Sequence, residues 1–323
     1  MDKSTNIKSP LLSIVVPLYN EEESFTLLIS RLNGVMDTIG VETEVVLVDD
    51  GSRDKTSLLM NQVALTDTRY QCVFLSRNFG HQLALTAGLT CVRASRAVMV
   101  IDGDLQDPPE LLNDFYSKLN EGYDVIYGVR KSRKEESSFK KATANIFYRM
   151  LKRISYIDIP LDTGDFCMLS RKVVDVLNAM PEESRYIRGM RAWVGFNQTG
   201  LEFERQERVA GDTKYPLKKM IKFAYDGIFN FSQLPIKFIT QLGLFSILIA
   251  LGYLAYTLYK KIVYHNVIEG FTGLLFAIIL FSGVQLISLG IIGEYVLRIF
   301  FQSKQRPLFI IKRKIIEGKE ADV

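Results

Sequence analysis

Two acidic residues, Asp102 and Asp104, follow a strongly apolar run and are separated by a single glycine. Two carboxylates at this spacing can converge on one hard divalent cation, because Mg²⁺ and Mn²⁺ prefer oxygen ligands. Such a cation would neutralise charge on a departing diphosphate. A solvated acidic turn is the alternative. The apolar run before the pair and the tandem prolines after it, Pro108 and Pro109, favour the metal site.

Acidic residues also follow two earlier apolar runs. Asp49 and Asp50 follow one of these runs, and Glu21 follows the other. Taken singly, these positions can be explained by helix starts: Ser52 or Asp54 can cap a helix, and an acid in the first turn favours the helix dipole. Taken together, three acidic clusters after three apolar runs predict one site.

The composition excludes several other kinds of site. The 323 residues include only two histidines and three cysteines, and no Cys-x-x-Cys spacing occurs. These numbers argue against a disulfide framework, a histidine-ligated zinc site or a histidine-based triad. Acid, base and metal roles therefore fall to carboxylates. The net charge of +4 is mild, and no basic stripe interleaved with aromatic residues predicts a nucleic acid partner.

The elements that must position these residues follow an α/β pattern. Apolar runs predict strands at 12–17, 44–49, 71–75, 97–102, 124–129 and 166–169, and helical spacing predicts helices at 22–39, 55–65, 137–154 and 171–179. Continuous apolar strands separated by helices predict a mostly parallel sheet that is covered on both faces. Such sheets bind ligands at the carboxyl ends of their strands, so all three acidic clusters are expected at one edge.

The C-terminal third of the chain predicts attachment to a membrane. Residues 217–235 combine lysines with aromatic residues, as expected of an interfacial amphipathic helix; an ordinary helix packed on the sheet is the alternative. Two apolar runs, 236–259 and 270–296, are long enough to span a bilayer as helices. The positive charge of the tail, 297–323, exceeds that of the short connection between the runs.

This charge distribution predicts the orientation of the chain. Basic segments stay on the cytoplasmic side, so the tail and the N-terminal domain, 1–216, are expected in the cytoplasm. The N-terminus has no apolar signal core, and we expect no cleaved signal peptide. The prediction is a multi-pass protein of the inner (cytoplasmic) membrane.

Several motifs, in order along the chain, carry a resemblance that covers nearly its whole length. They are Pro17-Leu-Tyr-Asn-Glu21, Val48-Asp-Asp-Gly-Ser52, Asn78-Phe-Gly80, Asp102-Gly-Asp-Leu-Gln-Asp107, Gly164-Asp-Phe166 and Ala210-Gly-Asp-Thr-Lys-Tyr215. With this set the chain resembles the inverting family 2 glycosyltransferases. The last two motifs and the two C-terminal spans make it similar to the polyprenyl-phosphate branch, which includes dolichol-phosphate mannose synthases and bacterial bactoprenol glucosyltransferases.

The resemblance implies a GT-A-like sheet of the nucleotide-diphosphosugar transferases and a role for particular residues. It places six residues at the nucleotide-sugar: Pro17, Tyr19, Glu21, Asp49, Asp50 and Asp102. Asp102 and Asp104 are placed at the metal and diphosphate, and Gln106 at the sugar. Four cations are placed at the acceptor phosphate: Arg130, Lys140, Lys141 and Lys214. Asp165 matches a family carboxylate near the reaction centre, as a positioning group or weak base. A turn-capping role beside Gly164 is the alternative.

The resemblance also implies the reaction. It is an inverting transfer of a hexose, with glucose from UDP-glucose as the first choice, to polyprenyl (undecaprenyl) phosphate, with Mg²⁺ or Mn²⁺ as cofactor. The product would be a lipid-linked donor for cell-surface glycan or O-antigen modification of lipopolysaccharide. UDP-N-acetylglucosamine, UDP-galactose and GDP-mannose are the alternative donors that the same resemblance allows. Membrane lipids and a homo-oligomer, with a tetramer as the candidate form, are the expected partners.

Three other classes of protein remain as alternatives. A processive polysaccharide synthase is disfavoured because two spans offer little material for an export channel. A nucleotidyltransferase would also use carboxylates and a divalent metal, but its expected glycine-rich loop is missing from residues 17–21. A non-catalytic membrane scaffold built on the same fold would be expected to have lost the carboxylates. The presence of Asp102, Asp104 and Asp165 argues against it.

Overall fold

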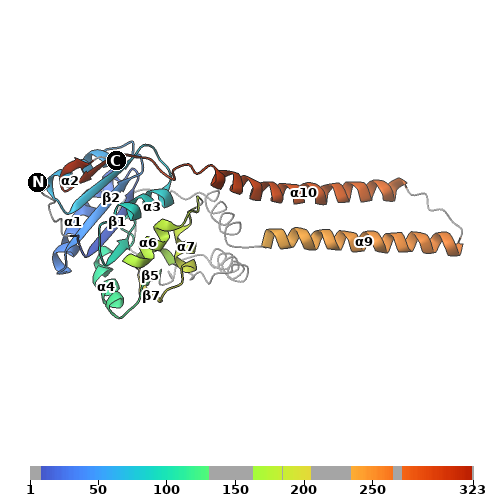
Figure 1. The fold of residues 1–323 in the computed structure, drawn as a ribbon, viewed down its shortest axis with the longest axis horizontal. Helices are drawn as coiled ribbons and strands as arrows, with labels where there is room; N and C mark the ends of the chain where they lie inside the picture. The colour runs from blue at the N-terminus through green and yellow to red at the C-terminus, as the bar shows by residue number, and fades with distance from the viewer. Residues whose placement is uncertain (1–8, 131–162, 184, 205–233, 265–270, 322–323) are drawn as a thin grey trace, which may run out of the picture. The chain divides into compact units, whose positions relative to one another are not determined.

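The computed structural model describes residues 9–130, 163–183, 185–204, 234–264 and 271–321. The chain divides into two compact units (Figure 1). The first comprises Met1–Tyr148, Ile157–Lys218 and Arg306–Val323 and contains the sheet. The second comprises Arg149–Tyr156 and Lys219–Gln305 and contains two long apolar helices. The sheet unit therefore includes the C-terminal segment in addition to the domain predicted at 1–216.

Nine strands of the described residues form one sheet. In chain order they are β1 (Leu12–Leu18), β2 (Thr43–Asp49), β3 (Tyr70–Leu75), β4 (Ala97–Val100), β5 (Val125–Arg130), β6 (Thr163–Ser170), β7 (Gln198–Phe203), β8 (Ile311–Ile316) and β9 (Lys319–Ala321). Across the sheet their order is β7-β5-β6-β4-β1-β2-β3-β8-β9. The central strands β4, β1, β2 and β3 are parallel, which confirms the predicted α/β core. β6 runs antiparallel to both of its neighbours, β4 and β5.

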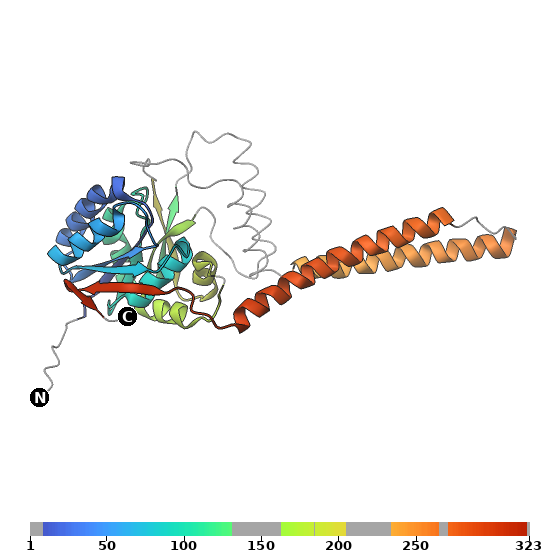
Figure 2. The same cartoon turned by 90° about the horizontal axis from the view of Figure 1, so that it is seen from above.

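Helices cover both faces of this sheet (Figures 1 and 2). They are α1 (Glu22–Thr38), α2 (Thr56–Thr66), α3 (His81–Cys91), the 3₁₀ turn η1 (Pro109–Leu111), α4 (Leu112–Asn120), α6 (Arg171–Ala179) and α7 (Ile187–Trp193). Ile14 and Val16 of β1 share a core with Phe25 of α1. The next side chain, Val15, faces α3 so closely that a Cβ on Gly88 would overlap it. Burial on both faces explains why these strands are continuous apolar runs.

The predicted strand runs correspond to β1 through β5, with ends that differ by one or two residues. The predicted helix at 171–179 coincides with α6, and the run at 166–169 lies inside the longer β6. No bounds were predicted for α3, α4 or α7, whose apolar residues are interrupted by polar ones. The predicted helix at 137–154 lies outside the described residues.

The segment predicted as a basic tail, 297–323, contains two strands of the sheet. β8 pairs antiparallel with β3, and β9 pairs with β8. In Figure 2, β8 is the red strand that lies beside the blue strands of the N-terminal half. Arg93, just after α3, connects these parts, since its guanidinium contacts Glu44 of β2 at 2.9 Å and Glu317 at 2.7 Å. The C-terminal strands are therefore joined to the sheet by ion pairs as well as by backbone hydrogen bonds.

Replacing Glu44 with alanine should lower the free energy of unfolding by about 2–3 kcal/mol, because its partners lose a buried carboxylate. Glu44 accepts hydrogen bonds from Ser13 Oγ at 2.6 Å and from the backbone N of Arg93 at 2.8 Å. Denaturant unfolding of the purified chain in detergent measures the loss. Glu121→Ala is the matched control, since its ion pair with Lys118 lies on the surface and should contribute nothing measurable. Equal losses in the two variants would contradict this account of Glu44.

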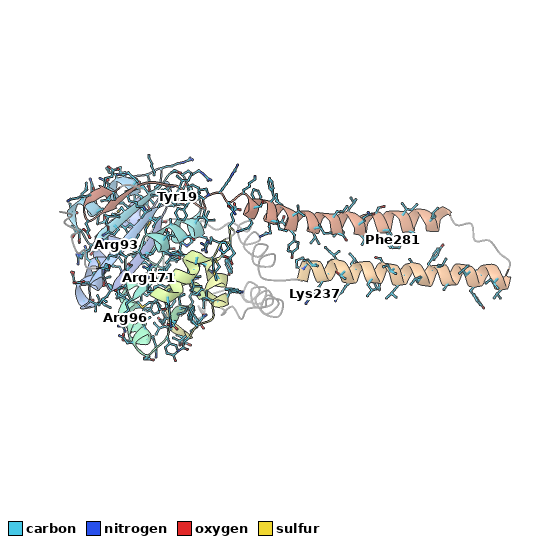
Figure 3. The ribbon with its side chains drawn as sticks, viewed as in Figure 1. Tyr19, Arg93, Arg96, Arg171, Lys237 and Phe281 are labelled. Carbon is cyan, nitrogen blue, oxygen red and sulfur yellow. The ribbon has the colours of Figure 1, made fainter. Side chains whose placement is uncertain are left out.

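The second unit contributes α9 (Leu234–Tyr264) and α10 (Phe271–Ser303). Two stretches, Pro235–Lys260 and Leu280–Ser303, are long and apolar enough to cross a membrane. Large apolar side chains are exposed along both helices, Leu248 and Leu286 among them. Figure 3 labels one of these side chains, Phe281. Soluble proteins rarely expose continuous apolar surface of this extent. The first stretch matches the predicted span at 236–259; the second begins at Leu280, later than the predicted 270. Most of the predicted interfacial helix, 217–233, lies outside the described residues.

Candidate active site

The carboxyl ends of the central parallel strands meet at one edge of the sheet. β1 and β2 are paired from Leu12 with Thr43 to Leu18 with Asp49, so both strands end together. The loops after β1, β2 and β4 carry the three acidic clusters. Ligands of open α/β sheets bind outside the carboxyl ends of the strands. This edge is therefore the candidate active site.

Hydrogen bonds join the loops after β1 and β2. The backbone N of Asn20 donates to Ser52 Oγ at 3.0 Å, and the backbone N of Glu21 donates to Thr56 Oγ1 at 2.9 Å. Asn20 adopts a φ of 53°, a left-handed conformation in which asparagine is enriched. Asp54 accepts from the backbone N of Thr56 at 3.0 Å, but the cap position of α2 is taken by Lys55, and neither Ser52 nor Asp54 occupies it. The two loops form one continuous rim of the site.

Three residues predicted for the nucleotide lie along this rim. Pro17 is buried within β1, and Glu21 is half-buried directly before α1. Tyr19 lies just beyond β1 with its side chain exposed to solvent (Figure 3). An exposed aromatic ring beside a strand end offers a flat face on which a nucleobase can stack.

Asp49 and Asp50 hold the loops together. Asp49 accepts from the backbone N of Ser52 at 2.9 Å. The two oxygens of Asp50 accept from the backbone N of Phe79 at 2.7 Å and of Gly80 at 2.9 Å. Burial raises the pKa of Asp50 above its ordinary value, and the two amide hydrogen bonds act in the opposite direction. Asp50 thus fixes the loop after β3, so that its effect on a bound nucleotide would be exerted partly through that loop.

The pair Asp102 and Asp104 lies directly beyond β4. Asp104 Oδ1 accepts from the backbone N of Gln106 at 3.1 Å, and Leu105 between them has a φ of 58°. Asp102 Oδ1 is buried and lies 3.4 Å from Nε2 of His81. Burial raises the pKa of Asp102, and His81 opposes this effect. Gln106 is itself buried, at the end of this tight turn.

Asp165 reaches the same edge because β6 runs antiparallel to β4, so that the start of β6 lies beside the end of β4. Its side chain is only 3% exposed. Arg188 Nε donates to its carboxylate at 2.9 Å, as does Gln82 Nε2, and His81 Nε2 lies at 3.3 Å. Burial alone would raise the pKa of Asp165, but Arg188 and His81 hold it well below its usual range. Asp165 is therefore a fixed anion within β6, and the turn-capping alternative does not apply.

Three residues of this cluster were not predicted from the sequence: His81, Gln82 and Arg188. His81 and Gln82 begin α3 directly after the Asn78-Phe-Gly80 motif, and that position was a signal that could have found them. Burial would lower the pKa of His81, but Asp102 and Asp165 raise it to about 9, so the imidazole is cationic at neutral pH. Arg188 lies on α7, and no spacing or composition in the sequence singled it out.

Arg130 ends β5 and lies over the start of β6. A Cβ on Gly164 would come within 2.7 Å of Arg130 Nη2, so the glycine leaves room for the guanidinium. The same nitrogen lies 3.8 Å from the buried carboxylate of Asp107. Arg130, which is one of the cations predicted to bind the acceptor phosphate, thus lies beside the start of β6, where Asp165 is located. The other cations of that prediction, Lys140, Lys141 and Lys214, lie outside the described residues.

Asp102 and Asp104 fit a divalent cation in their chemistry. Both supply carboxylate oxygens, and a cation beside Asp102 would offset the cost of keeping a partly buried carboxylate, with Oδ1 out of contact with solvent, in its ionised form. Among the described residues, no three His, Cys, Asp or Glu side chains gather as a metal site. The two carboxylates would therefore supply only part of the oxygen ligands that such a cation needs.

Comparison with known families decides the class of protein. Residues 13–177 match the family described as glycosyl transferase family 2. The chain belongs to this family. This family 2 glycosyltransferase therefore catalyses glycosyl transfer, and its α/β sheet is of the GT-A-like type. The resemblance inferred from the motifs is confirmed.

Several relatives match this glycosyltransferase over most of its length. It is 45% identical to the uncharacterized glycosyltransferase YkcC of Bacillus subtilis (strain 168), over 95% of each chain. It is 36% identical to the bactoprenol glucosyl transferase of Shigella phage SfV, over 94% of this chain and 98% of the relative. The prophage bactoprenol glucosyl transferase homolog of Escherichia coli (strain K12) is 35% identical over the same shares.

Proposed function

We propose that this glycosyltransferase transfers glucose from UDP-glucose to a polyprenyl phosphate such as undecaprenyl phosphate. The observation that carries the proposal is the similarity to bactoprenol glucosyl transferases, which extends over 94% of this chain. A water-soluble donor and a lipid-borne acceptor suit a sheet unit joined to candidate membrane spans. UDP-N-acetylglucosamine, UDP-galactose and GDP-mannose remain the alternative donors.

The chemistry is a single in-line displacement. An acceptor phosphate oxygen forms a bond to the anomeric carbon, while the bond from that carbon to the diphosphate oxygen breaks and its electron pair leaves with UDP. The acceptor phosphate is largely dianionic near neutral pH, since the second pKa of such monoesters is about 6. It needs no strong base. Catalysis rests on positioning the phosphate and on stabilising the charge that develops on the leaving diphosphate.

The candidate site offers groups for each of these tasks. We assign binding of the nucleotide to Pro17, Tyr19, Glu21, Asp49 and Asp50. Asp102 and Asp104 would bind the metal and diphosphate, and Gln106 would contact the sugar. The acceptor phosphate is assigned to the cations Arg130, Lys140, Lys141 and Lys214. Mg²⁺ or Mn²⁺, when bound by the two carboxylates, would supply positive charge at the leaving diphosphate. Asp165, held as an anion by its neighbours, acts as a positioning group.

The membrane arrangement is part of the proposal. α9 and α10 form two spans in an inner membrane, and the basic segment after α10 keeps the sheet unit on the cytoplasmic side, where nucleotide-sugars are found. The lipid-linked sugar would then serve cell-surface glycan or O-antigen modification. A homo-oligomer, such as a tetramer, is the proposed assembly.

Incubation of the purified chain with a panel of labelled nucleotide-sugars, with and without undecaprenyl phosphate, tests this function. We expect label in the organic phase only when the lipid phosphate is present, with UDP-glucose as the best donor and UDP as the second product. Release of inorganic diphosphate would indicate the nucleotidyltransferase alternative. Absence of a labelled lipid with every donor would overturn the proposal.

A further inference from the structure

Asp165, Arg188 and Gln82 form a connected group at the start of β6. Arg188 contacts both oxygens of Asp165, with Nε at 2.9 Å from Oδ1 and Nη2 at 3.3 Å from Oδ2. Gln82 contributes both ends of its amide. Its Nε2 donates to Asp165 Oδ2 at 2.9 Å, and its Oε1 accepts from the backbone N of Ile187 at 2.9 Å. One glutamine of α3 therefore holds both the carboxylate and the first turn of the helix that carries Arg188.

Exposure differs sharply within this group. The Asp165 side chain is 3% exposed and the Arg188 side chain is 29% exposed. A molecule that enters the site from solvent therefore meets the guanidinium before it meets the carboxylate. This order suits an anionic ligand, and it does not suit a carboxylate whose task is to remove a proton from a substrate.

The guanidinium retains binding capacity. An arginine presents five N–H donors in a planar fork, which matches phosphate as well as carboxylate oxygens. Asp165 occupies Nε and Nη2, and within the described part of the chain no partner is recorded for Nη1 of Arg188. Arg188 also lies close enough to Asp102 to favour its ionised form, so its charge acts at the end of β4 as well as at β6.

We propose that Arg188 is a phosphate-binding residue of the reaction centre, and that Asp165 and Gln82 are the positioning residues that aim its guanidinium. The proposal rests on the proposed function, in which both reacting partners carry phosphate. The phosphate is that of the lipid acceptor or that of the departing diphosphate. In either case Asp165 acts by holding a cation in one orientation, and no proton passes to it.

Alanine at position 188 tests the contact. With UDP-glucose and undecaprenyl phosphate, Arg188→Ala should lower kcat/KM about 100- to 1000-fold, as loss of one aimed charge donor does in other enzymes. Added guanidinium at sub-denaturing concentration should raise kcat/KM of this variant about tenfold, because it can occupy the vacated position.

The kinetic constants of Arg188→Ala distinguish the two phosphates. A raised KM for the lipid with unchanged UDP affinity would identify the acceptor phosphate; weakened UDP affinity would identify the diphosphate. A folded variant that guanidinium does not rescue would overturn the phosphate contact.

A matched control is Arg69→Ala. Arg69 also pairs with a carboxylate, Asp67, at 2.8 Å, but it precedes β3 at the opposite edge of the sheet. The Arg69→Ala variant should retain wild-type kcat/KM. Arg188→Lys, which keeps the charge but not the fork, should fall between Arg188→Ala and wild type. Near-wild-type turnover by Arg188→Ala would overturn the proposal.

A double-mutant cycle tests the positioning role. If Asp165 acts through Arg188, the pair Asp165→Asn and Arg188→Ala should cost about as much as Arg188→Ala alone. Additive losses would mean that Asp165 acts independently and would overturn its role as a positioning residue. If the wild-type chain forms no lipid-linked sugar, the proposed function fails by itself. The phosphate contact of Arg188 is then tested in the same variants by measuring their affinity for UDP and the rate at which they hydrolyse the nucleotide-sugar with water.

Discussion

Replacing Asp104 with asparagine should lower the rate of sugar transfer by about 1000-fold or more, which is the largest effect expected of any single change. Asparagine keeps an oxygen that can accept from the backbone N of Gln106, as Asp104 Oδ1 does at 3.1 Å, so the turn after β4 should persist. The variant loses the negative charge that would hold the divalent cation. Without that cation the charge on the leaving diphosphate is poorly stabilised.

The rate of UDP release with saturating donor and acceptor measures this loss. Asp114→Asn is the matched control, because it makes the same substitution at an exposed acid of α4 in the following segment. It should retain full activity. The apparent Mn²⁺ requirement of residual Asp104→Asn activity should also shift to higher concentration. Unchanged turnover in Asp104→Asn would remove the metal from the account and favour a metal-independent enzyme, whereas no turnover in the wild type or the variant would favour the non-catalytic scaffold.

Replacing Gly51 with alanine should lower the free energy of unfolding by about 3 kcal/mol, from a strained backbone and a steric clash together. Gly51 has a φ of 70°, and a Cβ there would lie 2.6 Å from the carbonyl carbon of Arg77 and 2.7 Å from the backbone N of Asn78. Both atoms are backbone, so the loop after β3 must move. The amides that Asp50 holds lie one and two residues further along this loop. We therefore expect the KM for the nucleotide-sugar to rise about tenfold as well.

Gly40→Ala separates the two causes. Gly40 has nearly the same φ, 69°, but no atom lies within 4 Å of its Cβ position. The free energy of unfolding of this variant should fall by only about 1 kcal/mol, because only the left-handed backbone conformation is disfavoured. The KM for the donor should be unchanged. Denaturant unfolding and donor kinetics measure both variants. Equal losses in Gly51→Ala and Gly40→Ala would contradict the close approach of the two loops.

The central sheet could be predicted because burial on both faces turns its strands into continuous apolar runs. Acidic clusters after β1, β2 and β4 were then expected at one edge, since parallel strands share their carboxyl ends, and the structure confirms that placement. The C-terminal strand β8 could not be predicted in the same way. Its sequence, Ile311–Ile316, has three consecutive basic residues between isoleucines, and it resembles a solvated tail. Arg313 of β8 nevertheless lies 3.9 Å over the ring of Phe74 on β3.

The surroundings of Asp165 were also beyond the sequence. A motif match could suggest Asp165, but its contact with Arg188 depends on β6 running antiparallel to β4 and on the path of the chain between β6 and α7. Neither feature leaves a periodic pattern in the residues. The difference matters chemically, because a carboxylate expected as a positioning group or weak base proves to be clamped by a guanidinium and an imidazole.

The anomeric configuration of the lipid product tests the central claim most directly. The account requires one displacement by the acceptor phosphate at the carboxyl edge of the sheet, with no covalent sugar–enzyme intermediate. Nuclear magnetic resonance of the lipid made from UDP-α-glucose and undecaprenyl phosphate should therefore show a β-linked glucosyl phosphate. An α-linked product would mean retention of configuration at the anomeric carbon, and would contradict the proposed single in-line displacement.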